Sequence, residues 1–577
     1  MTERAARPAP PRRTRDPLPA SIAAAALLGL VVGLCFPSLH VAVEPAQLWA
    51  GIVAYPDDNP YGLYQRRLWT VLHQLLAALL ALGVPERALS FALSGAAGAL
   101  AFAAAGAVAA ALGASAPQAA FAATLLWMLN PAAWGFGYPI LIAGHPHTYG
   151  MLGLAWIVLA WGVLGAGRFA WGGFLLGCAP AVHPSLGAWA AVVTAICVAS
   201  DWRRIGAARA ALLRGGALGA ALAGASLAWH LAQQTPGPAV DPAEVERVFD
   251  AYLAFWDSHR APFVPSAWQA AAIVASTALT CALLVRGPQA PGPTLLLRAV
   301  VACTALGMGF AVLADRAPGA IHDAVLALMP SRLVNVSMFA LVPSLIGALA
   351  LRWDAPVARL ACYAVGALTA WTPRLPQLEW ALFGAVALAT VLLWLRTPAA
   401  APRATRWDFA IASGVALGIA AAVLPGLAKQ PVRAARMYDF RSDAAFAAAS
   451  RGEGLLAVAP PIAMAQLRTR RPLLLDPNAI DMLPYAPAGG PLLARIVTDV
   501  YGKDFFAVPR SARRLTAVDP RIARPVWEAR TADAWRALGA RYGFRDVLAP
   551  ADWRIDLPLV ARSERLALYA LGPSGSQ

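Results

Sequence analysis

Long runs of apolar residues, each near the thickness of a lipid bilayer, recur along most of this 577-residue chain. A helix of about 20 apolar residues spans the hydrocarbon core of a membrane. The composition agrees, because 59% of the residues are hydrophobic and only 14% are charged, whereas a soluble domain carries about a quarter charged residues. The pattern predicts an all-α polytopic membrane bundle.

We predict about 13 transmembrane helices in this bundle, within residues 19–428. Their approximate limits are residues 19–41, 89–112, 119–142, 149–166, 169–182, 185–199, 210–231, 267–285, 299–314, 333–351, 358–372, 378–395 and 408–425. The fifth and sixth are short and meet at His183-Pro184, so one bent or re-entrant unit is the alternative reading. The apolar residues 68–83 are predicted to form a helix along the membrane interface.

The charges predict how the chain is oriented. Residues 1–18 form a basic, Pro-rich tail that precedes the first span, and we interpret that span as an uncleaved anchor. With this tail inside, Arg and Lys gather in the inner segments, around residues 203–214 and 396–406, and the outer loops are more acidic. This distribution follows the positive-inside rule and predicts an N-in/C-out topology. The formal charge of +16 therefore requires no nucleic-acid partner.

Titratable side chains gather on the predicted outer face. All eight histidines fall at or near it: His40, His73, His145, His147, His183, His230, His259 and His322. Because such groups collect where binding or chemistry occurs, the outer face is predicted to be the functional one.

Residues 429–577 differ from the rest of the chain because they contain short alternating strand and helix patterns. This pattern predicts a small C-terminal α/β extracytoplasmic domain. Strands are expected at 454–459, 472–476 and 544–548, with a strand pair in 557–571. Helices are expected at 461–468 and 524–541. Helices that alternate with strands are typical of a small α/β unit.

Asp57 and Asp58 are the candidate catalytic residues. They lie in Pro56-Asp-Asp-Asn-Pro60, in the first outer loop. One carboxylate would be a general base, or a metal ligand, at the membrane surface. The alternative is an ordinary turn, because Pro, Asp and Asn have turn-forming chemistry.

Several histidines are candidates for binding a substrate. His145 and His147 are two residues apart in a Pro-containing loop, so both can face one ligand or one metal ion, and ordinary interfacial histidines are the alternative. Pro184 breaks a helix, so His183 is predicted to line a cavity or to form a polar plug within the bundle.

Two further outer loops supply candidates for binding a phosphate. The loop 233–266 contains an apolar stripe from Val245 to Trp256, which predicts an amphipathic helix on the membrane surface, either a lid over a lipid substrate or a plain anchor. His259 and Arg260 follow it. The loop before residue 333 contains His322, Asp323 and Arg332, which are predicted to bind the donor phosphate or the substrate. A guanidinium group at headgroup depth suits a phosphate, and contact with ordinary lipid phosphates is the alternative for Arg332.

This layout resembles the C-type glycosyltransferase (GT-C) superfamily, the polytopic enzymes that use polyprenyl-phosphate-linked sugars. It is most similar in architecture to the oligosaccharyltransferase catalytic subunits, which have an acidic first outer loop and an outer C-terminal domain. The resemblance implies that Asp57 and Asp58 supply the first-loop carboxylate. His145 and His147 stand where that subgroup has an acidic pair, and its Trp-Trp-Asp motif is absent.

The resemblance implies an integral membrane glycosyltransferase of a bacterial inner membrane, with its C-terminal domain periplasmic or extracellular. Its partners would be a polyprenyl-phosphate-linked sugar, a saccharide, lipid or protein acceptor, and membrane lipids. The resemblance implies no specific cofactor, and a divalent metal ion is the alternative. The alternatives are a transporter or flippase of lipid-linked saccharides, a polysaccharide polymerase or ligase, and a non-catalytic relative.

Overall fold

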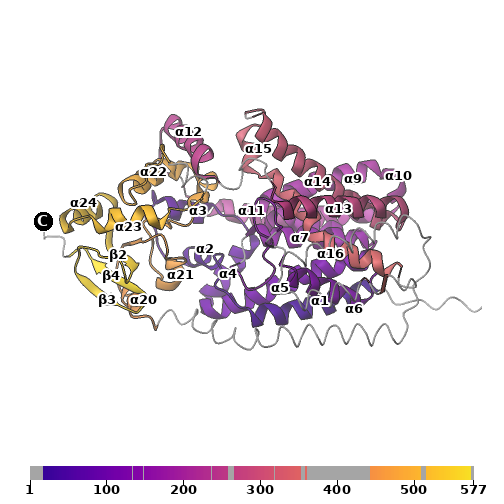
Figure 1. The fold of residues 1–577 in the computed structure, drawn as a ribbon, viewed down its shortest axis with the longest axis horizontal. Helices are drawn as coiled ribbons and strands as arrows, with labels where there is room; N and C mark the ends of the chain where they lie inside the picture. Colours follow the sequence, from indigo (N-terminus) through magenta and orange to yellow (C-terminus); the bar gives the residue numbers. More distant parts are fainter. Residues whose placement is uncertain are drawn as a thin grey trace, which may run out of the picture.

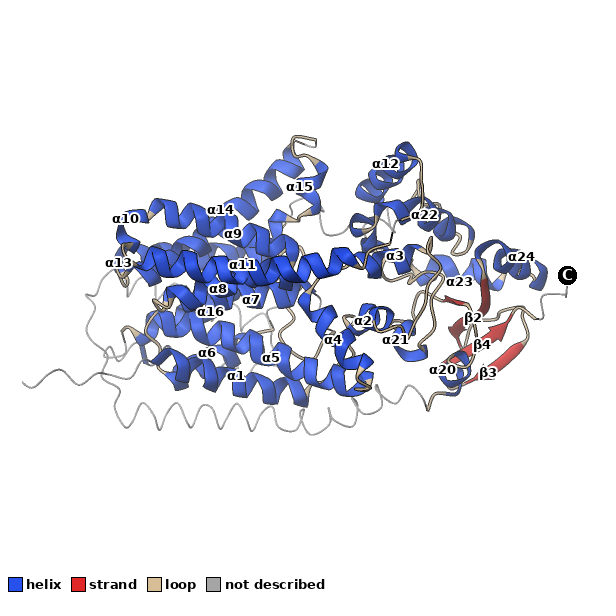
Figure 2. Ribbon diagram, turned by 180° about the vertical axis from the view of Figure 1, so that it is seen from behind, coloured by secondary structure: helices blue, strands red, loops and turns tan. Residues whose placement is uncertain are grey.

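The computed structural model places most of the chain in a helical bundle and a C-terminal unit (residues 442–572). It describes residues 17–130, 132, 134–146, 149–235, 237–257, 265–317, 319–352, 358–359, 361, 442–508 and 515–572. The long bundle helices run along the longest axis of the molecule, and the C-terminal unit lies beyond one end of them (Figures 1 and 2).

Within the part of the chain that the structure describes, six segments of the bundle are long and apolar enough to cross a membrane: Leu18–Cys35, Glu86–Ala111, Ala208–Ala232, Ala267–Arg286, Pro291–Arg316 and Val325–Ala350. The bundle helices are α1 (Pro17–Cys35), α5 (Glu86–Ala111), α6 (Ala116–Met128), α7 (Tyr149–Gly165), α8 (Phe169–Val182), α9 (Pro184–Ser200), α10 (Trp202–Ile205), α11 (Ala208–Ala232), α13 (Ala267–Arg286), α14 (Pro291–Arg316), α15 (Asp323–Ala327), the 3₁₀-helix η3 (Pro330–Leu333) and α16 (Val334–Ala350). The chain is therefore a mostly helical membrane protein.

The six segments are fewer than the 13 predicted spans. The predicted spans 149–166, 169–182 and 185–199 correspond to the shorter apolar helices α7, α8 and α9. The last two of these helices meet at His183, as the short spans indicated. The predicted spans 378–395 and 408–425 lie outside the described residues, as does 358–372 apart from residues 358, 359 and 361.

The prediction of one continuous helix over residues 119–142 is wrong. Helix α6 ends at Met128, and Asn130 takes a left-handed conformation with φ 49°. Gly137 also has a positive φ, and residues 134–146 contain no helix. The breakers in this stretch, including Pro139, outweigh its apolar composition, because proline removes a backbone donor and glycine favours turns.

Pairs of bundle helices pack closely through glycines. On α8 and α11 the glycines are spaced four residues apart, at Gly173 and Gly177 and at Gly215 and Gly219. A Cβ atom at Gly219 would lie 2.2 Å from the Phe174 carbonyl oxygen. Small residues at this spacing let membrane helices approach backbone to backbone.

The first loop, defined here as residues 36–85, carries three short helices. They are α2 (Val43–Trp49), α3 (Pro60–Arg67) and α4 (Val71–Ala81). The Asn59 side chain caps α3 by accepting the Gly62 backbone N–H at 2.8 Å, and Pro60 occupies the first helical position. This local sequence therefore ends a turn and starts a helix.

The apolar stripe of the loop 233–266 faces the C-terminal unit, which corrects the prediction of a membrane-surface helix. It forms α12 (Pro242–Ala251) and the π-helix η2 (Tyr252–Trp256). The Trp256 ring is buried, stacks on Phe505 with 5.1 Å between ring centroids, and donates its N–H to the Phe505 carbonyl at 3.0 Å. Val248 packs near Gly490. Aromatic burial against the C-terminal unit accounts for the stripe.

The C-terminal unit is a small sheet covered by helices. Its elements are α20 (Ala444–Ala449), β1 (Leu455–Val458), α21 (Ala465–Thr469), the 3₁₀-helices η4 (Ile480–Tyr485) and η5 (Pro487–Gly489), α22 (Gly490–Asp499), α23 (Pro520–Glu528), α24 (Ala532–Tyr542), β2 (Phe544–Pro550), β3 (Leu559–Arg562) and β4 (Leu566–Ala570). The strand order is β1-β2-β4-β3, with β1 and β2 parallel and the other pairs antiparallel.

Most elements predicted for this unit are present, with two corrections. The predicted strand 472–476 pairs with β1 through one isolated bridge, between Leu456 and Leu473. The predicted helix 524–541 is divided into α23 and α24, because Thr531 caps a new helix by accepting the Ala534 N–H at 3.3 Å.

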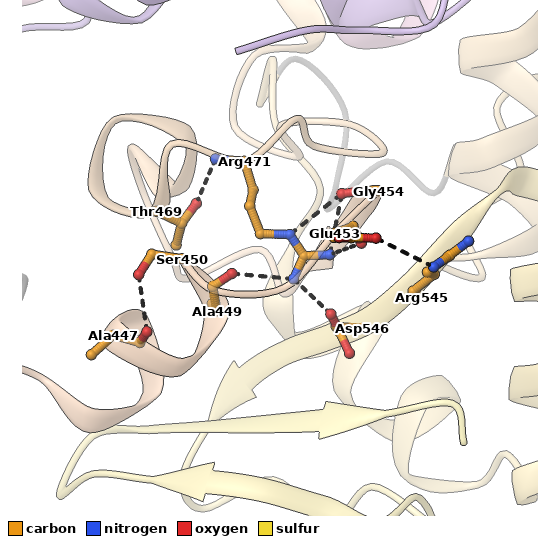
Figure 3. Close-up of polar contacts among 9 residues, drawn as sticks. All are labelled: Ala447, Ala449, Ser450, Glu453, Gly454, Thr469, Arg471, Arg545 and Asp546. Carbon is orange, nitrogen blue, oxygen red and sulfur yellow. Dashed lines mark hydrogen bonds and ion pairs between the residues drawn. The ribbon is translucent and has the colours of Figure 1, made fainter. Parts of the chain in front are cut away.

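Arg471 fixes the interior of the C-terminal unit (Figure 3). Its guanidinium group donates to Asp546 Oδ2 at 2.6 Å, to the Glu453 carbonyl at 2.6 Å and to the Gly454 carbonyl at 3.1 Å. It also donates to the Ala449 carbonyl at 3.3 Å. The residue is 2% exposed, so its charge and its donors are satisfied within the protein.

Candidate functional site

The first loop and the C-terminal unit are joined by a buried set of hydrogen bonds that we call the polar latch. At its centre, Gln466 donates to the Glu44 carbonyl at 2.7 Å. The Gln466 side-chain oxygen accepts from the Tyr55 hydroxyl at 2.6 Å and from Gln65 Nε2 at 2.7 Å. Because these groups are buried, each would be costly to leave without its partner.

Two further contacts extend the polar latch. Asn59 donates to the carbonyls of Leu473 and Leu474 at 3.1 and 3.0 Å. Arg470 forms a two-pronged ion pair with Glu86, at 2.7 and 2.8 Å. The C-terminal unit is therefore held against both the first loop and the start of α5.

A pair of buried carboxyl groups lies beside the polar latch. Glu44 is 1% exposed and accepts the Tyr61 hydroxyl at 2.7 Å and the Leu467 N–H at 3.1 Å. Burial, and then the charge of Asp476, raise the pKa of Glu44 from 4.5 to about 7. Burial also raises the pKa of Asp476, although Asn478 donates two hydrogen bonds to it. Two acids in such surroundings favour the protonated form of at least one.

Arg332 lies in η3, which packs against α9, α14 and α16. It is 7% exposed, its Nε has no hydrogen-bond partner, and no ion pair joins its guanidinium group to a described residue. The group stands over the Tyr138 ring, 4.6 Å from the centroid. A buried guanidinium group without acceptors is costly, and an anionic ligand would satisfy it.

Asp481, in η4 of the C-terminal unit, lies close enough to Arg332 for their charges to interact. Burial raises the pKa of Asp481 to about 6, the charge of Arg332 opposes this shift, and Asp257 and Asp476 add to it. Asp481 remains partly exposed. His183 is also close enough to Arg332 for their charges to interact. The charge of Arg332 thus interacts both with a partly exposed carboxyl group of the C-terminal unit and with an imidazole of the bundle.

Three tyrosines form a row of rings near Asp481. The Tyr61 and Tyr64 rings stack at 6.1 Å, and the Tyr64 and Tyr485 rings are 5.8 Å apart. Burial, followed by the neighbouring Tyr149 and Asp481, raises the pKa of Tyr64 well above its usual range, so its hydroxyl stays protonated. We call Arg332, Asp481, His183, Tyr64 and Tyr485 the junction site.

The predicted catalytic aspartates are exposed, and no hydrogen bond or ion pair among the described residues joins them to the junction site. Asp57 has an 88% exposed side chain and pairs with Arg66 at 3.0 Å. Asp58 is also exposed, and both lie in a turn, as the alternative reading of this stretch expected. Their catalytic role stays a prediction.

The other predicted ligands divide into three groups. Arg332 and His183 lie close enough for their charges to interact. His145 and His322 are exposed. His147, His259, Arg260 and the side chain of Asp323 lie outside the described residues.

Sequence reasoning missed Glu44, Asp476 and Asp481. Glu44 carried a usable signal, because a lone acid among apolar residues and tyrosines in a first loop indicates burial. Asp481 lies in a Pro-rich stretch with no periodicity that would have drawn attention to it.

Among the described residues, no three His, Cys, Asp or Glu side chains converge as they would to hold a metal ion. No protein-family model, curated protein or solved structure matches the chain.

Proposed function

We propose that this protein is an integral membrane glycosyltransferase. It moves a sugar from a polyprenyl-phosphate-linked donor to an acceptor hydroxyl at the junction site, on the outer face of a bacterial inner membrane. The observation that carries the proposal is the buried Arg332 guanidinium group, which has no hydrogen-bond or ion-pair partner among the described residues and whose charge interacts with the partly exposed carboxyl group of Asp481.

In this proposal Asp481 is the general base. A carboxyl group with a pKa of about 6 is mostly ionised at neutral pH and is still basic enough to accept a proton. It takes the proton of the acceptor hydroxyl as that oxygen bonds to the anomeric carbon of the donor sugar. Asp57 and Asp58 are assigned no direct role here, because both are exposed and no hydrogen bond or ion pair among the described residues joins them to Arg332 or Asp481.

Arg332 supports departure of the lipid phosphate. The bond between the anomeric carbon and the phosphate oxygen breaks, and its electron pair stays on the phosphate. A guanidinium group offers paired N–H donors that match phosphate oxygens, and burial strengthens that attraction. His183, whose charge interacts with that of Arg332, adds a further polar group.

The test is release of polyprenyl phosphate by the reconstituted full-length protein, supplied with polyprenyl-phosphate hexoses and pentoses. We expect Asp481→Asn to lower the rate at least 100-fold with donor binding retained, because a general base contributes about 10²–10⁴-fold. Arg332→Met should weaken donor binding. Arg316→Met, which removes an exposed arginine from the end of α14, is the matched control. It should leave the rate of release and donor binding unchanged.

Other outcomes would redirect the assignment. Loss of release in Asp57→Asn/Asp58→Asn, with Asp481→Asn unaffected, would place the catalytic centre in the first loop. Tight donor binding without release by the wild type would overturn transfer and favour a flippase or a non-catalytic binder. The wild-type rate should also decline as the pH falls below about 6, because Asp481 is then protonated.

A further inference from the structure

We propose that Tyr64 and Tyr485 form an aromatic platform that binds a sugar ring at the junction site. This inference rests on the proposed function and adds to it the part of the protein that recognises a saccharide. Tyr64 belongs to α3 in the first loop, and Tyr485 is the last residue of η4 in the C-terminal unit.

The two rings differ in exposure in a way that suits a platform. Tyr485 is 43% exposed, whereas Tyr64 is half-buried and rests on the buried ring of Tyr61. The Tyr64 and Tyr485 ring planes are inclined at 55°, with 5.8 Å between centroids. A row of rings thus runs from the buried carboxyl group of Glu44, which binds Tyr61, to an aromatic surface in contact with solvent.

The polar groups beside the platform match a saccharide. The C–H face of a sugar ring is apolar and packs on an aromatic ring, while its hydroxyl groups require hydrogen-bond partners. Asp481 lies four residues before Tyr485 in the same element, and its charge interacts with Tyr64. A carboxylate accepts hydrogen bonds from hydroxyl groups, and tyrosine hydroxyls donate or accept them.

These features favour a sugar over the polyprenyl chain of the donor. An isoprenoid tail would require an apolar lining, and placing it beside Asp481 would remove a carboxyl group from water without a hydrogen-bond partner. A saccharide supplies that partner. The platform also requires both the first loop and the C-terminal unit, so the polar latch is needed to assemble it.

The experiment measures saccharide binding without any lipid-linked donor. Full-length protein in detergent is applied to immobilised trisaccharides of glucose, galactose, mannose, arabinose and N-acetylglucosamine. We expect the wild type to bind at least one of them, and Tyr485→Ala to weaken that binding at least tenfold. Tyr485→Phe keeps the ring and should bind within threefold of the wild type.

Trp202→Ala is the matched control. Trp202 is 44% exposed, nearly the same as Tyr485, and lies in α10 at the opposite end of the bundle (Figure 1). The Trp202→Ala variant should bind the trisaccharides as the wild type does. Equal binding by Tyr485→Ala and the wild type, or no binding of any trisaccharide, would overturn the platform.

The results also separate the platform from the reaction. Saccharide binding that depends on Tyr485, without release of polyprenyl phosphate, would keep the platform and withdraw transfer. Release of polyprenyl phosphate that is unaffected by Tyr485→Ala would keep transfer and withdraw the platform.

Discussion

At the scale of single residues, Arg332 and Arg471 place the same charged group in two different environments. Arg471 meets an aspartate and three backbone carbonyls, whereas Arg332 meets the face of a tyrosine ring and no acceptor among the described residues. Buried charges normally have hydrogen-bonded partners. The difference between the two is therefore an argument for function at Arg332 and for structure at Arg471.

This contrast predicts opposite effects on stability. Arg471→Met leaves Asp546 and three carbonyls without their donor, so we expect the free energy of unfolding to fall by about 3–5 kcal/mol. Arg332→Met replaces an unsatisfied cation with an apolar side chain, so stability should be unchanged or higher while donor binding is lost. Thermal unfolding of both variants in detergent measures this. A large loss of stability in Arg332→Met would mean that the guanidinium group has a structural role.

At the scale of elements, apolar runs predicted most helices, because the length and the hydrophobicity of a buried or membrane-spanning helix can be seen in its own residues. Helices α5, α11 and α13 lie close to their predicted limits. Two predictions about elements were wrong, for different reasons. Asn130 and the following breakers end α6 early, and the stripe ending at Trp256 was amphipathic for contact with protein rather than lipid. Hydrophobic periodicity indicates that a face is covered, and does not identify what covers it.

Helix packing supplies the prediction at this scale. At Gly219 a methyl group would collide with the backbone of α8, whereas at Gly224, on the same helix, it would meet nothing within 4 Å. We expect Gly219→Ala to lower the free energy of unfolding by about 1–3 kcal/mol, the cost of overpacking. Gly224→Ala should be neutral or stabilising by up to about 1 kcal/mol, because alanine favours a helix. Equal unfolding midpoints for the two variants would contradict close packing of α8 on α11.

At the scale of the whole molecule, the junction site joins three distant parts of the chain. Arg332 follows α15, Asp481 belongs to the C-terminal unit, and Tyr64 belongs to the first loop. Arg332 could be predicted because a charge at the start of an apolar run is unusual. Asp481 and Tyr64 could not, because only the tertiary contacts of the polar latch bring them to the same place, and no local pattern records such contacts.

Attachment of the C-terminal unit is predicted to weaken as the pH rises. The pKa of Glu44 is raised from 4.5 to about 7, so its contribution to stability is fully present below about pH 4.5 and is lost as the pH rises through 7. At about 1.4 kcal/mol per pH unit this loss is about 3 kcal/mol. Asp476 and Asp481 have raised pKa values and act in the same direction.

Thermal unfolding at pH 5 and pH 8 tests this, with Glu44→Gln for comparison. Glutamine keeps an oxygen to accept the Tyr61 hydroxyl but carries no titratable proton, so the variant should lose less stability between the two pH values. An identical loss in the variant and the wild type would show that Glu44 is not the group that titrates.

The polar latch also constrains how the protein is made. Tyr55 and Gln466 are separated by 411 residues, so a ribosome adding about 5–20 residues per second needs about 20–80 s to reach the second after the first. During that interval the first-loop groups that bond to Gln466, such as the Tyr55 hydroxyl, lack that partner. A nascent chain that stops before residue 466 would leave these first-loop groups exposed. A quality-control protease could therefore recognise an incomplete chain by this exposed loop.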